Sequence, residues 1–283
     1  RNPVPTWYFK GYYLQYIDGI PFKLKSTFDF SFMKEYGTVF KVYDDQDSGN
    51  ICFGTEKDGQ RYFVKFAGAP TEQFGGDPAD AISRLKATLP IYSDLKHENL
   101  IELIEAKEIG DGFAMVFKWA DSDCMGRMYP AAHRRFMQLP INDRLAVFSD
   151  ILSFLECVVS RNYVAIDFYD GSIMYDFANG KTTICDIDLF HKQPCVNDMG
   201  RMWGSSRFQS PEEYQLGADI DEITNVYTLG ATAFALFGEY NRTREKWQLS
   251  DKLFEIATRA VSDDRANRQQ TIRQFTAEWE AAQ

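Results

Sequence analysis

The sequence has few of the features that mark a disulfide-bonded, zinc-binding or membrane-spanning protein. Its five cysteines are odd in number and form no C-x-x-C pair, so neither a disulfide framework nor a zinc site is indicated. It has no run of about eighteen apolar residues, the length that a membrane-spanning helix requires. The first residues, RNPVPTWYFKGYY, lack the apolar core and the small-residue cleavage site of a signal peptide. We therefore expect a cytoplasmic protein without a membrane partner.

Positive charge is also scarce. The chain has 31 Lys and Arg against 41 Asp and Glu, which gives a formal net charge of -10 at pH 7. Such a chain repels phosphate backbones and anionic lipid and favours basic or neutral substrates and divalent cations. Nucleic acid is therefore not an expected partner. A length of 283 residues with 45% hydrophobic residues is enough to bury a core in one large domain or in two lobes.

Strand patterns dominate the first part of the chain. Residues 1–36 are rich in aromatic side chains and predict a small hairpin that packs on the strands that follow. Three strands are predicted next, at 38–44, 50–57 and 61–67, and Asp58-Gly59 predicts a tight hairpin between the second and the third. The sequence of this region therefore indicates an antiparallel sheet.

A helix is predicted over residues 77–95, with Asp77 as its N-cap and Pro78 at its first position. Pro90 is expected to kink it. Another strand is predicted at 113–120. Further along, Asn142 is expected to cap a long helix over 143–162, and the basic residues His133, Arg134 and Arg135 before it predict a solvated face.

Residues 164–190 carry the strongest indication of chemistry. Asn179-Gly180 lies between two short apolar runs and predicts a hairpin. Asp167 and Ser172 precede its first strand, and Asp186 and Asp188 follow its second strand, so all four oxygen-bearing side chains are expected at one end of the hairpin. Hard oxygen ligands suit Mg²⁺, which completes its shell with water and substrate phosphates. The pattern therefore favours phosphoryl transfer, although acidic residues beside a turn can also be purely structural.

The same residues resemble two motifs of the protein-kinase-like family. Asp167 in Ala165-Ile166-Asp167 corresponds to the Asp of H-R-D-x-x-x-x-N, and Ser172 to its Asn. The run Ile184 to Phe190 resembles the strand that leads into D-F-G, with Asp186 at the metal-binding position. On these motifs the chain resembles a divergent serine/threonine protein kinase of bacterial type.

Four further segments extend the resemblance to the nucleotide site. Lys65 resembles the V-A-I-K lysine that pairs the phosphates, and Ser48-Gly49 lies where a Gly-rich loop would cover them. Phe117 and Ala120 correspond to the fifth strand and hinge, where they would line the adenine pocket, and Asp123 could reach a ribose hydroxyl.

Three motifs after the hairpin add to the resemblance. Ser210-Pro211-Glu212 resembles A-P-E, residues 225–230 resemble D-x-W-S-x-G, and residues 264–268 resemble D-P-x-x-R. The family pattern implies that Glu212 and Arg268 form a buried ion pair across 56 residues of sequence.

The resemblance implies an α+β, bilobal protein-kinase-like fold with an antiparallel-sheet small lobe and a mainly helical large lobe. The implied divisions are an N-terminal extension (1–36), a small lobe (37–118), a hinge (119–124) and a large lobe (125–283). The implied activity depends on ATP and Mg²⁺ and transfers the γ-phosphate to a hydroxyl of a protein substrate, which the overall charge suggests is basic. Asp167 would be the catalytic base, Lys65 would balance phosphate charge, and Asp186, with Ser172 and Asp188, would bind the metal.

Two other interpretations remain open. The single glycine of the 47–50 loop, the absence of a Glu in helix 77–95, and Ser172 in place of Asn all favour a pseudokinase that binds nucleotide as a scaffold module. Gly171 before Ser172 resembles aminoglycoside and choline kinases and favours a small-molecule phosphotransferase, whereas Glu212 and Arg268 disfavour one. The carboxylate that holds Lys65 is either Glu72 or Asp80.

Overall fold

The computed structural model describes residues 7–9 and 11–283, and in it the chain divides into two compact units. The first comprises 1–93 and 101–120, and the second comprises 94–100 and 121–283. Neighbouring strands in the described sheets run antiparallel, and most of the helical residues lie in the second unit. The fold class is therefore α+β, as predicted.

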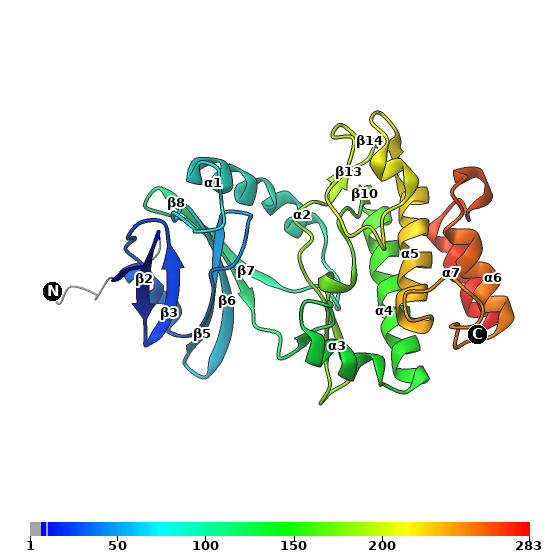
Figure 1. The fold of residues 1–283 in the computed structure, drawn as a ribbon, viewed down its shortest axis with the longest axis horizontal. Coiled ribbons are helices and arrows are strands. Elements are labelled where there is room, and N and C mark those ends of the chain that lie inside the picture. The colour runs from blue at the N-terminus through cyan, green and yellow to red at the C-terminus, as the bar shows by residue number, and fades with distance from the viewer. Residues whose placement is uncertain (1–6, 10) are drawn as a thin grey trace. The chain divides into compact units, whose positions relative to one another are not determined.

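The first unit is built on a five-stranded sheet in the order β4-β5-β6-β8-β7 (Figure 1). Its strands are Thr38–Tyr43 (β4), Asn50–Lys57 (β5), Gln60–Ala67 (β6), Leu103–Ile109 (β7) and Gly112–Lys118 (β8). Asp58 and Gly59, which link β5 to β6, both have positive φ, at 53° and 75°. The predicted strands and the tight Asp58-Gly59 hairpin are therefore confirmed.

One face of this sheet is covered by a smaller sheet in the order β1-β2-β3 and by a short 3-10 helix. These elements are Trp7–Phe9 (β1), Tyr12–Ile17 (β2), Ile20–Leu24 (β3) and Ser31–Tyr36 (η1). Phe22 and Phe30 pack with Phe53 and Phe66 of the larger sheet, and all four rings are buried. Burial of one such side chain contributes about 1.5–3 kcal/mol, so this layer is part of the core of the unit.

The region predicted as one kinked helix forms two helices, Pro78–Ala87 (α1) and Leu89–Asp94 (α2). Asp77 caps α1 as predicted, because its side chain accepts a hydrogen bond from the Ala79 backbone N–H at 2.9 Å. The break falls at Thr88, whose hydroxyl donates to the Leu85 carbonyl oxygen at 2.7 Å. Pro90 is accommodated near the start of α2, where a missing N–H leaves no helical bond unmade.

Residues 94–100, which the sequence analysis assigns to the small lobe, belong to the second unit. Asn99 accounts for this, because its backbone and its side chain both bond to the segment 182–184. The Asn99 side-chain amide donates to the Thr182 carbonyl oxygen at 3.0 Å, and the Ile184 N–H donates to the Asn99 carbonyl oxygen at 2.6 Å.

The second unit is mainly helical. Its longer helices are Pro130–Met137 (α3), Ile141–Ser160 (α4), Glu222–Phe237 (α5), Asp251–Ala260 (α6) and Ile272–Ala282 (α7), and the last four lie beside one another (Figure 1). The predicted Asn142 cap of α4 is wrong. The helix begins one residue before Asn142, and the N-cap position is Pro140, without a side-chain hydrogen bond.

The predicted hairpin is present as Ile173–Asp176 (β11) and Lys181–Ile184 (β12), with Asp123–Cys124 (β9) on the other edge of β11. Its turn spans four residues, 177–180, and Gly180 adopts positive φ, at 64°, whereas Asn179 does not. The Asp176 carboxylate accepts hydrogen bonds from the Ala178 and Asn179 backbone N–H groups. The predicted hairpin is therefore confirmed, and of Asn179 and Gly180 only Gly180 has positive φ.

The segment that follows the hairpin is held by short strand pairs and 3-10 turns. They are Tyr163–Val164 (β10), Asp170–Ser172 (η2), His191–Lys192 (β13), Cys195–Val196 (β14), Pro211–Tyr214 (η3), Asp219–Ile220 (β15) and Arg265–Asn267 (η4). β13 pairs with β10, and β14 with β15. Residues 191–220 are therefore anchored to the second unit at several points.

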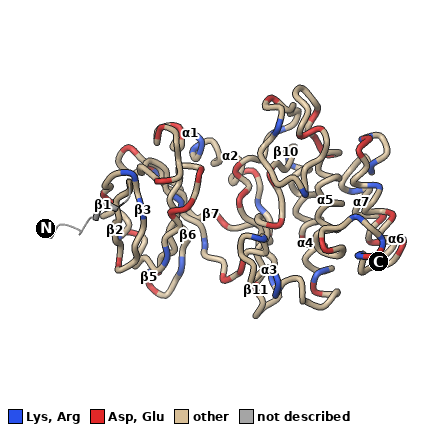
Figure 2. The backbone as a smooth tube through the Cα atoms, viewed as in Figure 1, with Lys and Arg blue, Asp and Glu red and all other residues tan. Residues whose placement is uncertain are grey.

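Charge is distributed over both units. Acidic and basic positions are interspersed along the backbone of each unit, without a long block of one sign (Figure 2). None of the helices in the described part of the chain has the length and hydropathy needed to cross a bilayer.

Candidate active site

The predicted site residues fall into two groups, one in each unit. Ser48, Gly49, Lys65, Phe117 and Ala120 lie in the first unit, and Asp123, Asp167, Ser172, Asp186 and Asp188 lie in the second.

Lys65 lies near the end of β6, between Cys52 of β5 and Met115 of β8. Val64 and Phe66, its neighbours along the strand, are fully buried in the core between the two sheets. Because side chains alternate along a strand, the half-buried Lys65 faces away from that core. Its place on this face agrees with the phosphate-binding role implied by the resemblance, which stays a prediction.

The two carboxylates considered as partners for Lys65 lie near the start of α1. Asp80 is exposed in the first turn of the helix, and Glu72 is half-buried five residues before Asp77. Which of them holds Lys65 stays a prediction.

Ser48 and Gly49 lie in the loop between β4 and β5, and this loop contacts α1. Arg84 of α1 donates a hydrogen bond to the Ser48 carbonyl oxygen at 3.1 Å. Gly49 has φ 86°, and a Cβ there would lie 2.8 Å from the Cβ of Ala81 and 2.8 Å from the ring of Phe74. Only glycine therefore lets the loop approach α1 this closely. Whether the loop covers phosphates stays a prediction.

Phe117 is buried at the end of β8 among other aromatic rings. Its ring centroid lies 6.4 Å from that of Phe63 and 5.1 Å from that of Tyr92. Phe63 precedes Lys65 by two residues, so both face the same side of the sheet, and Phe63 also contacts Trp119 at 6.4 Å. Ala120 is half-buried just beyond this aromatic wall. The adenine-binding role of Phe117 and Ala120 is untested.

In the second unit, Asp167 and Asp186 share an unusual backbone conformation. Both have φ 59°, in the left-handed region that side chains other than glycine rarely adopt. Such conformations cost about 1–3 kcal/mol, persist where the surrounding structure enforces them, and are enriched at functional sites. Asn162, Glu239 and Tyr240 of this unit also have positive φ, so Asp167 and Asp186 are the candidates for chemistry because they combine this conformation with the motif positions.

The electrostatics of Asp167 and Asp186 indicate that their carboxylates are neighbours. Burial, and after it the negative charge of Asp186, raise the pKa of Asp167 to about 7. A cation bound beside both would relieve this repulsion and return Asp167 to its ionised form. The donor set fits Mg²⁺, which takes one or two carboxylates and completes its shell elsewhere.

The side chains of the described residues do not form a complete metal site by themselves. Over residues 7–9 and 11–283, no group of three or more His, Cys, Asp or Glu side chains is arranged to hold a metal ion. A metal at Asp167 and Asp186 would therefore need ligands from water or from a bound phosphate, which is the usual coordination of Mg²⁺ in nucleotide sites.

Ser172 has a structural role in the loop that carries Asp167. It is fully buried, its hydroxyl accepts from the Tyr169 N–H at 3.4 Å, and it lies 3.5 Å from the Asp167 carbonyl oxygen. The Ser172 carbonyl oxygen accepts from the Cys185 N–H at 2.9 Å, which connects the loop to the segment carrying Asp186. The metal-binding role predicted for Ser172 stays a prediction.

The other two predicted residues of this unit are Asp188 and Asp123, and Asp186 itself is exposed. Asp188 is half-buried two residues beyond Asp186. Asp123 is exposed on β9, where its backbone pairs with Tyr175 of β11. Their metal-binding and ribose-binding roles are not tested by the geometry.

Helix α5 holds the loop that carries Asp167 through hydrogen bonds. Asn225 of α5 is fully buried, its side-chain oxygen accepts from the Ala165 N–H at 2.8 Å, and its side-chain amide donates to the Ala165 carbonyl oxygen at 2.8 Å. One side chain therefore satisfies both backbone groups two residues before Asp167, which a hydrophobic residue could not do.

The loop also holds residues that the sequence analysis did not assign to the site. Tyr169 folds over Gly171, where a Cβ would clash with its ring. Burial raises the pKa of Tyr169, and the charges of Asp167 and Asp186 raise it further. Asp170 is buried and accepts a hydrogen bond from the Tyr240 hydroxyl at 2.6 Å. The D-x-x-D spacing of Asp167 and Asp170 could have identified Asp170, whereas Tyr240 has no sequence signal near the loop.

A narrow pocket with no room for a water molecule lies beside Asp167 in the second unit. It is lined by Ala165, Asp167, Phe168, Gly204, Ser205, Phe208, Gln209, Glu213 and Thr228. Burial raises the pKa of Glu213 to about 7, while hydrogen bonds from the Ser210 backbone and hydroxyl act in the opposite direction. The segment 204–209 is therefore the part of the chain that borders the candidate catalytic aspartate.

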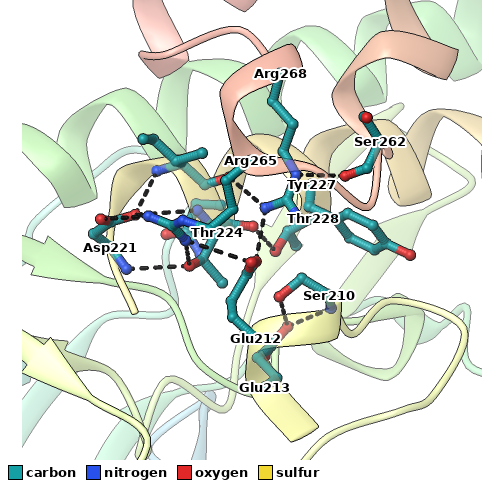
Figure 3. A network of polar contacts seen from close by, with 12 residues as sticks. Ser210, Glu212, Glu213, Asp221, Thr224, Tyr227, Thr228, Ser262, Arg265 and Arg268 are labelled. Atoms are coloured by element: carbon teal, nitrogen blue, oxygen red, sulfur yellow. Dashed lines mark hydrogen bonds and ion pairs between the residues drawn. The ribbon is translucent and has the colours of Figure 1, made fainter. Parts of the chain in front are cut away.

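The predicted ion pair between Glu212 and Arg268 is confirmed (Figure 3). The Arg268 guanidinium donates to the Glu212 carboxylate at 2.7 Å, and neither side chain is exposed by more than 4%. Arg265 lies 3.4 Å from the other Glu212 oxygen and also bonds Asp221 at 2.7 Å. The segment that borders Asp167 is thereby tied to η4 and to the N-cap of α5.

Comparison with known proteins adds no relative. No model of a known protein family matches the chain, and a search of curated proteins finds no similar sequence.

Proposed function

We propose that this chain is an ATP- and Mg²⁺-dependent phosphotransferase that acts on a hydroxyl of a protein substrate. The two units would be the small and large lobes of a divergent protein-kinase-like fold. The observation that carries the proposal is the pairing of Asp167 and Asp186, both at φ 59°, with the Asp167 pKa raised to about 7.

In this proposal each acidic residue has a separate task. Asp167 would accept the proton of the acceptor hydroxyl, since a base with a pKa near the working pH is suited to general base catalysis. Asp186 would bind Mg²⁺, which supplies charge neutralisation for the phosphates. Lys65 would neutralise further phosphate charge.

The supporting structure around these residues favours a protein kinase over a small-molecule kinase. The pair of Glu212 and Arg268 and the Asn225 bonds to Ala165 both match the motifs on which the resemblance rests. They hold the substrate-side segment 204–213 and the Asp167 loop on the same helical frame. The resemblance implies this frame for protein kinases and not for aminoglycoside kinases.

The second candidate function is a pseudokinase, and Ser172 is the observation that favours it. Its hydroxyl is buried against the backbone of its own loop and is already engaged. A metal site that lacks this ligand would bind the second Mg²⁺ of a kinase poorly. A chain with this defect could keep nucleotide binding and lose transfer.

Two measurements on the purified protein distinguish the candidates. The melting temperature is recorded with ATP alone, Mg²⁺ alone and both together, and transfer of label from γ-labelled ATP to a mixture of peptides is then measured. A shift that requires both ATP and Mg²⁺, together with labelling, supports the phosphotransferase. The same shift without labelling supports the pseudokinase, and no shift and no labelling would reject both. Asp186→Asn, which removes the proposed Mg²⁺ ligand, should lose the shift that requires both ATP and Mg²⁺. Asp176→Asn is its control and should keep that shift, since Asp176 lies at the other end of β11.

A further inference from the structure

Three arginines of the second unit gather near the Asp167 pocket. Arg207 directly precedes the pocket residue Phe208, and its guanidinium lies 4.6 Å from the ring centre of Tyr240. Arg127 lies 5.4 Å from the same ring. The Arg242 guanidinium donates to the Arg207 carbonyl oxygen at 3.4 Å. We call Arg127, Arg207 and Arg242 the arginine cluster.

The cluster is attached to the loop that carries Asp167. Arg207 lies 3.3 Å from the Asp170 carboxylate, three residues after Asp167 in the sequence. The same carboxylate oxygen accepts from the Tyr240 hydroxyl at 2.6 Å, while the other Asp170 oxygen is buried without a hydrogen-bond partner. Asp170 therefore fixes both Arg207 and Tyr240 beside the Asp167 loop.

The charges of the cluster do not cancel. Arg207 pairs with the Asp170 carboxylate, whereas Arg127 contacts the Tyr240 ring, and Arg242 donates to the Tyr227 hydroxyl and the Arg207 carbonyl oxygen. His133 packs against Tyr240 with tilted rings whose centres lie 5.8 Å apart, and it hydrogen bonds to the Met125 carbonyl oxygen. Glu239, beside Tyr240, pairs with Lys246. A local positive excess in a chain of net charge -10 marks a site for an anionic group.

The guanidinium groups are also accessible and oriented. Arg127 and Arg242 are exposed, and Arg207 retains 30% of its side-chain exposure. Stacking against Tyr240 and Tyr227 limits their rotamers, because Arg242 lies 5.2 Å over the Tyr227 ring. Planar guanidinium groups fixed in this way recognise carboxylates with little loss of side-chain entropy.

We propose that the arginine cluster binds acidic side chains of the protein segment that presents its hydroxyl to Asp167. The substrate class is then an acidic peptide, although the overall charge of the chain favours a basic one. This inference rests on the proposed function for its acceptor hydroxyl, but the recognition of acidic peptide can be measured without transfer.

The test uses three peptides that contain one serine flanked by Asp and Glu, by Ala, or by Lys. Their affinity for the full chain is measured by fluorescence anisotropy at low and at high salt. We expect the acidic peptide to bind best and to lose affinity as salt rises, since exposed ion pairs are screened. Equal affinity for the three peptides would overturn the proposal.

Charge reversal supplies the second arm of the test. The double variant Arg127→Glu/Arg242→Glu should weaken binding of the acidic peptide by about 10-fold and strengthen binding of the Lys peptide. The matched control is Arg134→Glu/Arg161→Glu, which makes the same change in net charge at exposed positions of the same unit. If the control variant loses as much affinity for the acidic peptide, the effect comes from overall charge, and the proposed site is refuted.

A milder variant guards against misfolding. Arg127→Gln removes one exposed guanidinium, and we expect it to weaken acidic-peptide binding by about 2- to 5-fold at an unchanged melting temperature. Binding of the acidic peptide without labelling from ATP would support the site and reject the phosphotransferase. Labelling without preference among the peptides would support the phosphotransferase and reject the arginine cluster as the binding site.

Discussion

The Glu212 carboxylate accepts a hydrogen bond from the Arg268 guanidinium at 2.7 Å, and the two side chains are buried although 56 residues of sequence separate them. Arg268 also donates to the Ser262 carbonyl oxygen at 2.8 Å, and Arg265 supports the second Glu212 oxygen. The pair is therefore the junction between the segment that borders Asp167 and the last helices of the chain.

Removal of one partner of this junction should destabilise the second unit. We expect Arg268→Met to lower the free energy of unfolding by about 3–5 kcal/mol, because the buried Glu212 charge is left uncompensated. Urea denaturation measures the change. Arg259→Met is the control, since Arg259 pairs with Glu278 at the surface and its loss should cost less than about 1 kcal/mol. Equal losses in the two variants would contradict the structural role of the pair.

Asn225 should be as sensitive to substitution as the ion pair. Asn225→Leu leaves the buried Ala165 N–H and carbonyl oxygen without partners, and each unpaired group costs about 1–3 kcal/mol. We expect a loss in that range or above it by denaturation. Asn225→Asp keeps the acceptor and should lose less. If Asn225→Asp loses as much stability as Asn225→Leu, the hydrogen bond from the Ala165 N–H does not account for the stabilisation by Asn225.

Gly171 allows Tyr169 to fold over the loop. A Cβ at residue 171 clashes with the Tyr169 ring, so we expect Gly171→Ala to cost about 1–3 kcal/mol of stability. The loss should shrink in the double variant Gly171→Ala/Tyr169→Ala, relative to Tyr169→Ala alone, because the clash is then absent. Gly75→Ala is the control, since a Cβ there meets no atom within 4 Å. An additive double variant would show that Tyr169 does not require the glycine.

The raised pKa of Asp167 predicts a dependence of stability on pH. Because the folded pKa is about 7, the folded state favours the protonated form. This contribution to stability is fully present below the unfolded pKa of about 4 and is lost as pH rises through about 7. Asp167→Asn is neutral at every pH, so its melting temperature should exceed that of the wild type more at about pH 8 than at about pH 5.

Asp176→Asn should show the opposite dependence. Hydrogen bonds from the Asn179 side chain and backbone lower the Asp176 pKa, so its ionised form is the stabilising one. This variant should lose stability relative to the wild type at about pH 8 and lose less as the pH falls toward the Asp176 pKa. For Asp167→Asn, a difference in melting temperature from the wild type that stays the same at every pH would contradict the raised pKa of Asp167.

The fold could be predicted from the sequence where local patterns determine the structure. Val64, Lys65 and Phe66 alternate between two faces because strand geometry requires it, and Asp58-Gly59 makes its hairpin because both residues accept positive φ. Asn179-Gly180 predicted the hairpin correctly, and the Asp176 side chain, which accepts hydrogen bonds from two backbone N–H groups of the turn, is a feature that only the structure shows.

The candidate site could be predicted only in part. Asp167 and Asp186 follow motif spacing, and Glu212 with Arg268 follows a family pattern, so all four could be named from the sequence. The arginine cluster could not be predicted, because Arg127 and Arg207 come from separate segments that meet at the Tyr240 ring, and Arg242 joins them through the Arg207 carbonyl oxygen. Ser172 was assigned to metal by its position, and its burial against its own loop is a tertiary property.

Phosphate transfer by the Asp167→Asn variant is the most direct test of the account. Label transfer from γ-labelled ATP with Mg²⁺ to the acidic, the Ala and the Lys serine peptides is compared for wild type and variant, both fully folded. The account predicts transfer by the wild type and a rate about 10² to 10⁴ lower in the variant. Full-rate transfer by Asp167→Asn would contradict the role of Asp167, and a wild type that transfers nothing would contradict the proposed activity.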